Sequence, residues 1–439
     1  MTSRSAPSRR RRNRPPQGGR EVPGFAARRA ALRLLDAVMR RGQPLETALH
    51  AAAQGLPGQD RSLAHAIAAE VLRWTIDLDA LIDSATPQRL PDDAKARMVL
   101  RLALAQIVRL ETPPHAVVAT ALPLVDGGPR KLVHGVLGTL IREGAVLPDI
   151  PSLPPGIADR WRAQWGEDVT AAAARALGRR APIDLTLADP AETARFTEMM
   201  DGASLMPGHI RLGHDTAVAD LPGFADGRWW VQDLAASLPA RLAGAGDGRS
   251  AIDLCAAPGG KTMQLAAAGW RVTALDSSAK RLERMAENLA RCNLTAETVK
   301  GDALTWEPPG PADLVLLDAP CSATGIFRRH PDVLHRAGPR QIAEMAEQQA
   351  LMLDRAAQWV RPGGLLIYAT CSLEQAEGEE QMANFHANHP GFAVDAPRTG
   401  ELPPAIIPSP EGWVRTLPGM LDEEGGLDGF FIARLRRTV

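Results

Sequence analysis

Apolar residues recur every three or four positions through the first third of the chain. Four segments each place three apolar residues on one helical face: Leu32, Leu35 and Val38; Leu63, Ile67 and Val71; Val99, Leu102 and Ile107; Val133, Val136 and Leu140. This spacing is typical of amphipathic α-helices. Pro, Gly and Asp residues separate the segments. The pattern therefore predicts an all-helical domain over residues 24–146.

The pattern changes after residue 146. LPDIPSLPPG, residues 147–156, contains four prolines and reads as a linker. A helix is expected over 157–178, strands over 183–188 and 229–231, and a helix over 233–243. Residues 147–245 are therefore interpreted as a linker and a small α+β subdomain.

Strand and helix patterns alternate from residue 246 to the end. The expected strands are 251–255, 271–276, 297–299, 312–318, 364–370 and 429–437. Helices are expected over 260–268, 278–291 and 340–360. Such alternation with short connections predicts an α/β core, a largely parallel, Rossmann-like sheet with helices on both faces. Ligands of such sheets bind outside the carboxyl ends of the strands. The whole chain is thus expected to be multidomain, with its catalytic domain at 246–439.

Composition and charge add little for the chain as a whole. With 439 residues and a net charge of −1, the sequence does not by itself indicate a nucleic-acid-binding protein. The charge is unevenly placed, because residues 1–20 hold seven arginines and no acidic residue. We expect residues 1–23 to form a disordered basic tail. Such a tail either grips phosphates or is simply solvated, and both interpretations remain open.

The four cysteines form no C-x-x-C pair, so neither a zinc site nor a disulfide framework is expected. Free thiols fit a reducing cytoplasm, and no apolar run or signal peptide indicates a membrane. Cys255 and Cys292, the latter expected inside a helix, are interpreted as small buried apolar residues. Cys321 and Cys371 differ from them, because each directly follows a predicted strand.

A glycine-containing loop, DLCAAPGGKT, lies at residues 253–262. Glycines at the start of a helix let the backbone approach a ligand closely. The loop is not a Walker A phosphate loop, because Cys255 stands where that motif requires glycine. The G-x-G-x-x-G dinucleotide pattern is also absent from the sequence. We therefore expect a ligand without phosphate groups.

Two aspartates indicate what that ligand is. Asp276 closes the second strand of the core and suits the two ribose hydroxyls of an adenosine. Asp302 follows the third strand, in a position to accept from an adenine amino group. Together with the loop, these acids predict a site for S-adenosylmethionine, which has a ribose and a sulfonium but no phosphate.

Two thiols at the ends of neighbouring strands indicate chemistry on a cytosine ring. Cys321 lies in DAPCSATG (318–325) and Cys371 in ATCSLEQAEGEE (369–380). C5 of cytosine is a poor nucleophile until a thiolate adds to C6, so methylation at C5 needs a cysteine beside a methyl donor.

Neighbouring residues suggest further roles. Ser372 and Gln375 match a capping box, which would place Cys371 at a helix N-terminus and favour its thiolate. Asp318 is expected in a desolvated pocket, where a protonated carboxyl would stabilise charge at N3 of the ring. Release of the thiol after methyl transfer is left open between Cys321, a water and a phosphate oxygen.

The sequence leaves the roles of four basic residues open. Arg328, Arg329 and His330, in IFRRHPDV, are expected to meet either substrate phosphates or acids of their own loop. Lys261 is expected to orient the site or to cap a neighbouring element.

These motifs resemble a known family. DLCAAPGGKT, LDSS (275–278), GDA (301–303), DAPCSATG, ATCSLEQAEGEE and DGFFIARL (428–435) are similar to the Sun-type RNA cytosine-C5 methyltransferases. RRHPDV and the helical N-terminal region look most like the bacterial 16S ribosomal RNA branch, called RsmB, Sun or Fmu. The resemblance covers about residues 230–439, and residues 24–146 resemble the NusB-like RNA-binding domain of that branch.

The resemblance implies a role for each candidate residue. Cys371 is implied as the nucleophile and Cys321 as an aid to product release. Contacts to S-adenosylmethionine are implied for residues of the loop and for three aspartates: Cys255, Ala256, Ala257, Pro258, Gly259, Gly260, Lys261, Asp276, Asp302 and Asp318. In DNA cytosine methyltransferases the Pro-Cys thiol attacks instead, which here would be Cys321.

Three functions remain in competition. The first is methylation of cytosine C5 in 16S ribosomal RNA by a monomeric cytoplasmic enzyme. The second is the same chemistry on transfer RNA, another RNA or DNA. The third is a non-catalytic NusB-like RNA-binding or antitermination factor with a remnant donor site. The presence of Asp318, Cys321 and Cys371 argues against the third.

Overall fold

Residues 22–439 are described by a computed structural model, and the predicted basic tail lies almost entirely outside this range. The first part of the described chain is helical, as the periodicity predicts. Its helices are α1 (Phe25–Met39), α2 (Leu45–Ala52), α3 (Gly58–Arg73), α4 (Thr75–Ser84), α5 (Lys95–Val108), α6 (Pro114–Ala121) and α7 (Gly127–Arg142). Their apolar faces form one core of buried side chains.

A kinked helix and a small antiparallel sheet follow. Helix α8 spans Pro155–Gly178, but Gly166 has a φ of +82° and interrupts the single helix that the sequence predicts. The sheet has the order β2-β1-β3. Its strands are β1 (Ile183–Leu187), β2 (His209–Leu212) and β3 (Trp229–Val231), with helix α9 (Thr193–Met199) after β1 and α10 (Leu234–Arg241) after β3.

The core sheet has the order β10-β11-β8-β7-β4-β5-β6, and β9 also pairs with β11. Its strands are β4 (Ser250–Leu254), β5 (Arg271–Asp276), β6 (Glu297–Lys300), β7 (Ala312–Asp318), β8 (Val360–Thr370), β9 (Phe392–Val394), β10 (Val414–Thr416) and β11 (Phe430–Arg437). Strands β4 to β8 are parallel, and β11 runs antiparallel to β8. This is the predicted α/β core with an antiparallel edge.

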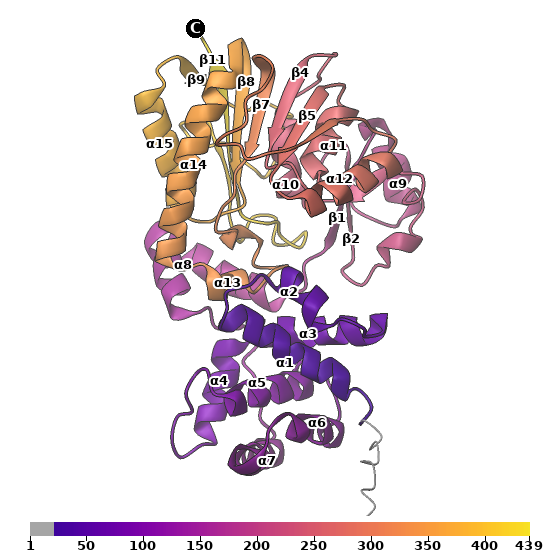
Figure 1. Cartoon of the computed structure of the whole chain (residues 1–439), viewed down its shortest axis with the longest axis vertical. Helices are drawn as coiled ribbons and strands as arrows, with labels where there is room; N and C mark the ends of the chain where they lie inside the picture. The colour runs from indigo at the N-terminus through magenta and orange to yellow at the C-terminus, as the bar shows by residue number, and fades with distance from the viewer. Residues whose placement is uncertain (1–21) are drawn as a thin grey trace, which may run out of the picture.

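Helices cover both faces of this sheet (Figure 1). Helices α14 (Pro339–Trp359) and α15 (Glu379–Asn388) lie on one face, and α10, α11 (Gly260–Ala267) and α12 (Ala279–Arg291) lie on the other. Each face has its own apolar core. Cys292 directly follows α12 and is buried, so it lies at the end of that helix and not inside it as expected.

The helical region lies against the segment that follows β7, which includes the short helix α13 (Val333–Arg336) (Figure 1). The guanidinium of Arg73 donates to the backbone oxygen of Arg328 at 2.6 Å. The backbone N–H of Leu45 donates to the carboxylate of Asp332 at 3.2 Å. Thus the segment that begins with the Pro-Cys motif ends in contact with the N-terminal helices.

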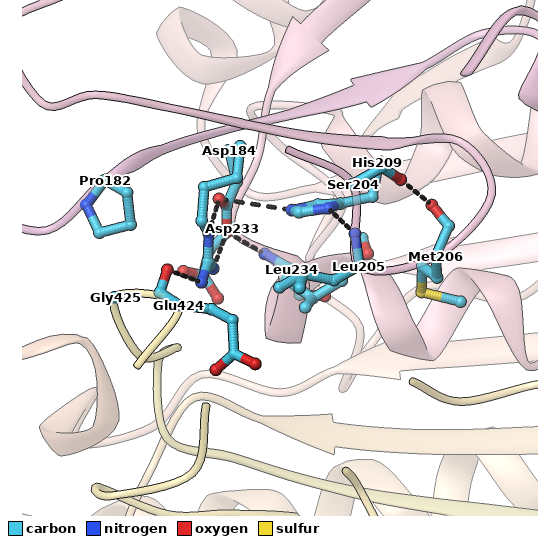
Figure 2. Close-up of polar contacts among 12 residues, drawn as sticks. Pro182, Asp184, Ser204, Leu205, Met206, His209, Asp233, Leu234, Glu424 and Gly425 are labelled. Carbon is cyan, nitrogen blue, oxygen red and sulfur yellow. Dashed lines mark hydrogen bonds and ion pairs between the residues drawn. The ribbon is translucent and has the colours of Figure 1, made fainter. Parts of the chain in front are cut away.

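A buried polar network ties the small sheet to the rest of the chain (Figure 2). Asp184 accepts from Nε and Nη2 of Arg211 at 2.7 and 2.8 Å and from the N–H of Leu234 at 3.0 Å. Arg211 also donates to the backbone oxygen of Glu424. Burial raises the pKa of Asp184, but the hydrogen bonds of Arg211 and His209 outweigh it and leave that pKa below its ordinary value. The network fixes the small sheet against the C-terminal loop.

Within residues 22–439, no helix is both long and apolar enough to cross a membrane.

Candidate active site

The glycine loop connects β4 to α11 and is shaped by two residues in the left-handed region. Cys255 has a φ of +60° and Gly259 a φ of +104°. A Cβ at Gly259 would lie 2.5 Å from Cγ of Met285, so glycine is required there. Burial first, and then the charges of Asp318, Asp276 and Asp253, raise the pKa of Cys255 to about 12. A thiol with so high a pKa is a poor nucleophile. The sequence predicted a small buried residue at this position, whereas Cys255 is only partly buried.

Asp276 ends β5, and its buried carboxylate holds the turn around it. It accepts from the backbone N–H of Ser278 at 2.8 Å and of Ala257 at 3.2 Å, and it pairs with Arg281 at 2.9 Å. Asp302, after β6, is exposed and accepts from the N–H of Leu304. Both acids lie at the carboxyl ends of their strands, as predicted.

These groups surround one cavity of about 350 Å³, within the size range of small-molecule sites. The cavity brings together seven of the candidate residues: Cys255, Ala257, Asp276, Asp302, Asp318, Cys321 and Cys371. The other candidates of the loop, Ala256, Pro258, Gly259, Gly260 and Lys261, do not line it. An adenosine-bearing donor fits this set, because the carboxylates of Asp276, Asp302 and Asp318, which can accept from ribose hydroxyls and an adenine amino group, line the same cavity.

The two thiols both line this cavity and lie close together. Sγ of Cys321 and Sγ of Cys371 are 3.5 Å apart. Their strands β7 and β8 are adjacent and parallel, and the N–H of Gly325 donates to the backbone oxygen of Cys371 at 3.0 Å. The hydrogen bond with Cys371, burial, and the nearby charges of Cys371 and Glu377 together raise the pKa of Cys321.

The surroundings of Asp318 are not those that the sequence predicted. Its carboxylate is 2.7 Å from Nζ of Lys261, and its side chain is 31% exposed. It therefore has a cationic partner and some contact with solvent, whereas the sequence suggested a desolvated pocket. Lys261 itself is buried and also lies over the ring of Phe430. The sequence suggested that Lys261 orients the site or caps a neighbouring element, and in the structure its ammonium contacts Asp318.

The predicted capping box after Cys371 is wrong. The segment continues into a short 3-10 helix, Gln375–Glu377 (η5), and α15 begins only at Glu379. The hydroxyl of Ser372 accepts from the N–H of Glu374 and donates to the carboxylate of Glu377. Consequently no α-helix N-terminus lies beside Cys371. A helix N-terminus therefore does not favour the thiolate of Cys371, contrary to the prediction from the sequence.

Arg328 and Arg329 contact acids of the protein. Arg328 pairs with Asp428 at 3.2 Å and Asp233 at 3.5 Å. Arg329 pairs with the same two carboxylates. Both acids belong to other segments of the chain and not to the arginines' own loop, so the expectation was only partly right. These pairs fasten the segment after β7 to the C-terminal loop and to α10.

Three residues that line the cavity lie outside every motif that the sequence analysis quoted: Arg281, Gln348 and Met352. Arg281 lies in the first turn of α12, close to Asp276. Gln348 and Met352 lie on α14. The helical pattern of α14 gave no signal of which polar residue reaches the cavity, because packing against the sheet decides that.

The sheet order, the glycine loop and the acids after β5 and β6 define a methyltransferase of the Rossmann-like class. Residues 242–436 match the family described as 16S rRNA methyltransferase RsmB/F, and residues 26–142 match the NusB family. The "Ribosomal RNA small subunit methyltransferase B" of Xylella fastidiosa (strain Temecula1) is 35% identical over 95% of this chain and 99% of its own length. That of Klebsiella pneumoniae (strain MGH 78578) is 33% identical over 93% and 97%.

This chain belongs to the 16S rRNA methyltransferase RsmB/F family, and it is an RNA methyltransferase of a kind that depends on S-adenosylmethionine. Solved structures support the fold. A methyltransferase homologue from Pyrococcus horikoshii has a TM-score of 0.54 at 24% identity, over 68% of this chain and 98% of its own. NSun6 from the same organism, solved with SFG, has a TM-score of 0.56 at 18% identity, over 65% and 98%.

Proposed function

We propose that this chain transfers a methyl group from S-adenosylmethionine to C5 of a cytosine in 16S ribosomal RNA, through a covalent bond between Cys371 and C6. The observation that carries the proposal is the pair of thiols, 3.5 Å apart, in the cavity that Asp276 and Asp302 also line. The names of the relatives, which are ribosomal RNA small subunit methyltransferases, favour 16S RNA as the substrate.

The donor site is proposed at the carboxyl ends of β4, β5 and β6. Asp276 would hold the ribose and Asp302 the adenine amino group, while Cys255 and Ala257 of the glycine loop line the same cavity. In this loop Ala256 and Pro258 set the path, and Gly259 and Gly260 start α11. When bound, S-adenosylmethionine supplies an electrophilic methyl group.

Cys371 is proposed as the nucleophile. Its thiolate forms a bond to C6, and the electron pair of the C5–C6 double bond moves into the ring, so that C5 becomes nucleophilic. After C5 has gained the methyl group, a base removes the C5 proton. The Cys371–C6 bond then breaks and restores the ring. Cys321, which lies next to Cys371, is proposed to assist this release by giving its proton to the departing sulfur.

Asp318, which lines the cavity, is proposed to face the N3 edge of the cytosine, with Lys261 behind it. Negative charge builds at N3 when the thiolate adds to C6, and the proton that Lys261 and Asp318 share is proposed to pass through the carboxyl group to N3 and neutralise that charge. The 2.7 Å contact between Lys261 and Asp318 keeps the carboxylate in place for that purpose.

The remaining regions are proposed to bind RNA. We place the boundaries at 24–146 for the NusB-like helical domain, 147–245 for the linker and small subdomain, and 246–439 for the catalytic domain. The helical domain contacts the segment after β7, and therefore presents RNA next to the thiols. We propose that the chain works in the cytoplasm, where its thiols stay reduced. We also propose that it works as a monomer.

Tritium release tests the proposed reaction. The full chain is incubated with S-adenosylmethionine and 16S RNA that carries tritium at C5 of cytosine. Methylation at C5 expels that tritium into water in a one-to-one ratio with methyl incorporation. Transfer RNA and DNA with the same label serve as alternative substrates. Methyl incorporation without tritium release would move the reaction to another atom, and transfer RNA as the better substrate would overturn the choice of RNA.

A further inference from the structure

We propose that Glu377 is the positioning residue that holds the two thiol-bearing loops together and thereby decides which cysteine attacks. The inference rests on the proposed function, because it presumes that one of the two thiols is the nucleophile. Glu377 belongs to the 3-10 helix η5, has no exposed surface and does not line the cavity. It acts through its neighbours and does not touch substrate.

The carboxylate of Glu377 binds both loops at once. Ser322, next to Cys321, donates its backbone N–H to Oε1 at 2.8 Å and its hydroxyl to Oε2. Ser372, next to Cys371, donates its hydroxyl to the same Oε2. One oxygen therefore receives the neighbours of both cysteines, so the position of this carboxylate fixes the distance between the two sulfurs.

The rest of the carboxylate is enclosed by α14 and β8. Nε2 of Gln349 donates to Oε1 of Glu377 at 3.0 Å and to the backbone oxygen of Pro320 at 2.8 Å. The hydroxyl of Tyr368 lies 2.9 Å from the backbone oxygen of Glu377 and 3.1 Å from Oε1 of Gln349. Gln349 and Tyr368 are fully buried. These buried groups hydrogen-bond to one another. A shift of either thiol-bearing loop would therefore break hydrogen bonds inside the protein, where water does not replace them.

The charge of Glu377 also acts on Cys321. The ionisable groups near it are both cysteines, Tyr368, Glu379 and Arg415; the guanidinium of Arg415 is itself bound by Glu379 and by the backbone oxygen of Ser372. Burial raises the pKa of Glu377 itself, and the hydrogen bonds from Ser322, Ser372 and Gln349 oppose that rise. When ionised, Glu377 adds to the effects that raise the pKa of Cys321, after the hydrogen bond with Cys371 and burial. Together with the 3.5 Å separation of the two sulfurs, this assigns Cys321 as the proton-bearing thiol and Cys371 as the attacking one.

Alkylation of the two thiols tests this role without RNA. The full-length chain is treated with iodoacetamide between pH 6 and 9, and peptide mass spectrometry gives separate rates for Cys321 and Cys371. The variants are Glu377→Gln, which keeps an acceptor oxygen and loses the charge, and Glu377→Ala. Asp313→Ala is the matched control, because Asp313 is a half-buried carboxylate at the opposite end of β7 that binds Ser250. Melting curves of all variants accompany the rates.

In the natural chain and in Asp313→Ala, Cys371 should react faster than Cys321. In Glu377→Gln the ratio of the two rates should fall more than twofold, because a charge that helps to keep Cys321 protonated is lost. A ratio within twofold of the natural one in both Glu377 variants would overturn the proposal. Methylation by the natural chain is measured separately. A chain that methylates no cytosine would contradict the proposed function, whereas the alkylation ratio still decides the role of Glu377.

Discussion

At the scale of single residues, Asp253 is an acid near the donor site whose pKa is raised well above its ordinary value. It is the second-last residue of β4 and is fully buried. Burial raises its pKa to about 7, although the hydroxyl of Thr262, 2.6 Å away, acts in the opposite direction. The unfolded chain has an ordinary aspartate pKa of about 3.9. Between about pH 3.9 and pH 7 the folded state binds the proton of Asp253 more tightly than the unfolded chain does. The free energy of unfolding therefore falls as pH rises through this range.

Asp253→Asn should remove this pH dependence. Relative to the variant, the natural chain should lose about 2–3 kcal/mol of stability between pH 5 and pH 8, on the scale of two pKa units. Urea denaturation of both chains at the two pH values measures the difference, in which the other titrating groups cancel. If the difference in stability between the two chains does not change with pH, Asp253 is ionised throughout.

Asp276→Ala should weaken binding of S-adenosylhomocysteine by about 1–3 kcal/mol, the scale of hydrogen-bonding groups left unpaired. The loss has two sources, because Asp276 is proposed to hold the ribose and also accepts from the N–H of Ala257 in the glycine loop. Titration calorimetry measures the affinity. Asp354→Ala, on the outer side of α14 next to His389, serves as the control and should bind normally. Equal affinities would place the ribose contact elsewhere.

The sequence predicted which residues lie close together in the site wherever those residues follow predicted strands. Asp276, Asp302, Cys321 and Cys371 follow predicted strands, and the carboxyl ends of parallel strands share one edge of the sheet. The partner of Asp318 was not predictable. Lys261 lies on another element, and only the packed structure brings its ammonium to that carboxylate.

At the scale of elements, the two thiol loops pass each other at Gly325. A Cβ at this position would lie 2.0 Å from the backbone oxygen of Gly429 and 2.9 Å from that of Cys371. Backbone atoms cannot move aside as a flexible side chain can. Glycine is therefore needed where the segment after β7 crosses the end of β8.

Gly325→Ala should destabilise the chain by about 1–3 kcal/mol, the usual cost of overpacking, and should lower methyl transfer with it. Gly338→Ala is the control, because a Cβ at Gly338 meets no atom within 4 Å. Thermal melting and methyl transfer to RNA are measured on both. Similar melting temperatures and rates for the two variants would mean that the crossing is less tight than described.

Long elements with clear periodicity were predicted within a few residues, as α14 and β7 illustrate. The capping box at Ser372 and Gln375 was wrong for a physical reason. The hydroxyl of Ser372 is held by Glu377, which in turn binds Ser322 from the other loop. A local pattern contains no signal for such a distant partner. Strands β2, β9 and β10 were missed because three or four residues carry no measurable period. Strand β3 is as short, but its Trp-Trp-Val composition indicated a strand.

At the scale of the whole molecule, Arg73 joins three regions. Its guanidinium donates to the backbone oxygens of Leu177 in α8 and of Arg328 after β7, at 2.9 and 2.6 Å. The helical region therefore rests on the segment that starts at the Pro-Cys motif. The sequence predicted the separate regions, but it had no pattern that reported how they face one another.

Arg73→Ala should raise KM for RNA and leave the affinity for S-adenosylhomocysteine unchanged, because it loosens the helical region and not the donor site. Two hydrogen bonds from a charged group are lost, each worth about 1.5–3 kcal/mol. Arg340→Ala is the control, since Arg340 is almost fully exposed. Steady-state methylation and titration calorimetry give the two quantities. An affinity for the donor analogue that falls together with the affinity for RNA would contradict this separation.

The central claim is that Cys371 attacks and Cys321 releases, and covalent trapping measures it most directly. Both alanine variants are incubated with S-adenosylmethionine and substrate RNA and analysed on denaturing gels, with and without 5-fluorocytosine in the RNA. Cys371→Ala should neither methylate nor become trapped by the fluorinated RNA. Cys321→Ala should still attack, release slowly and accumulate a protein–RNA adduct on unmodified RNA. An adduct from Cys371→Ala and none from Cys321→Ala would contradict the account and make Cys321 the nucleophile.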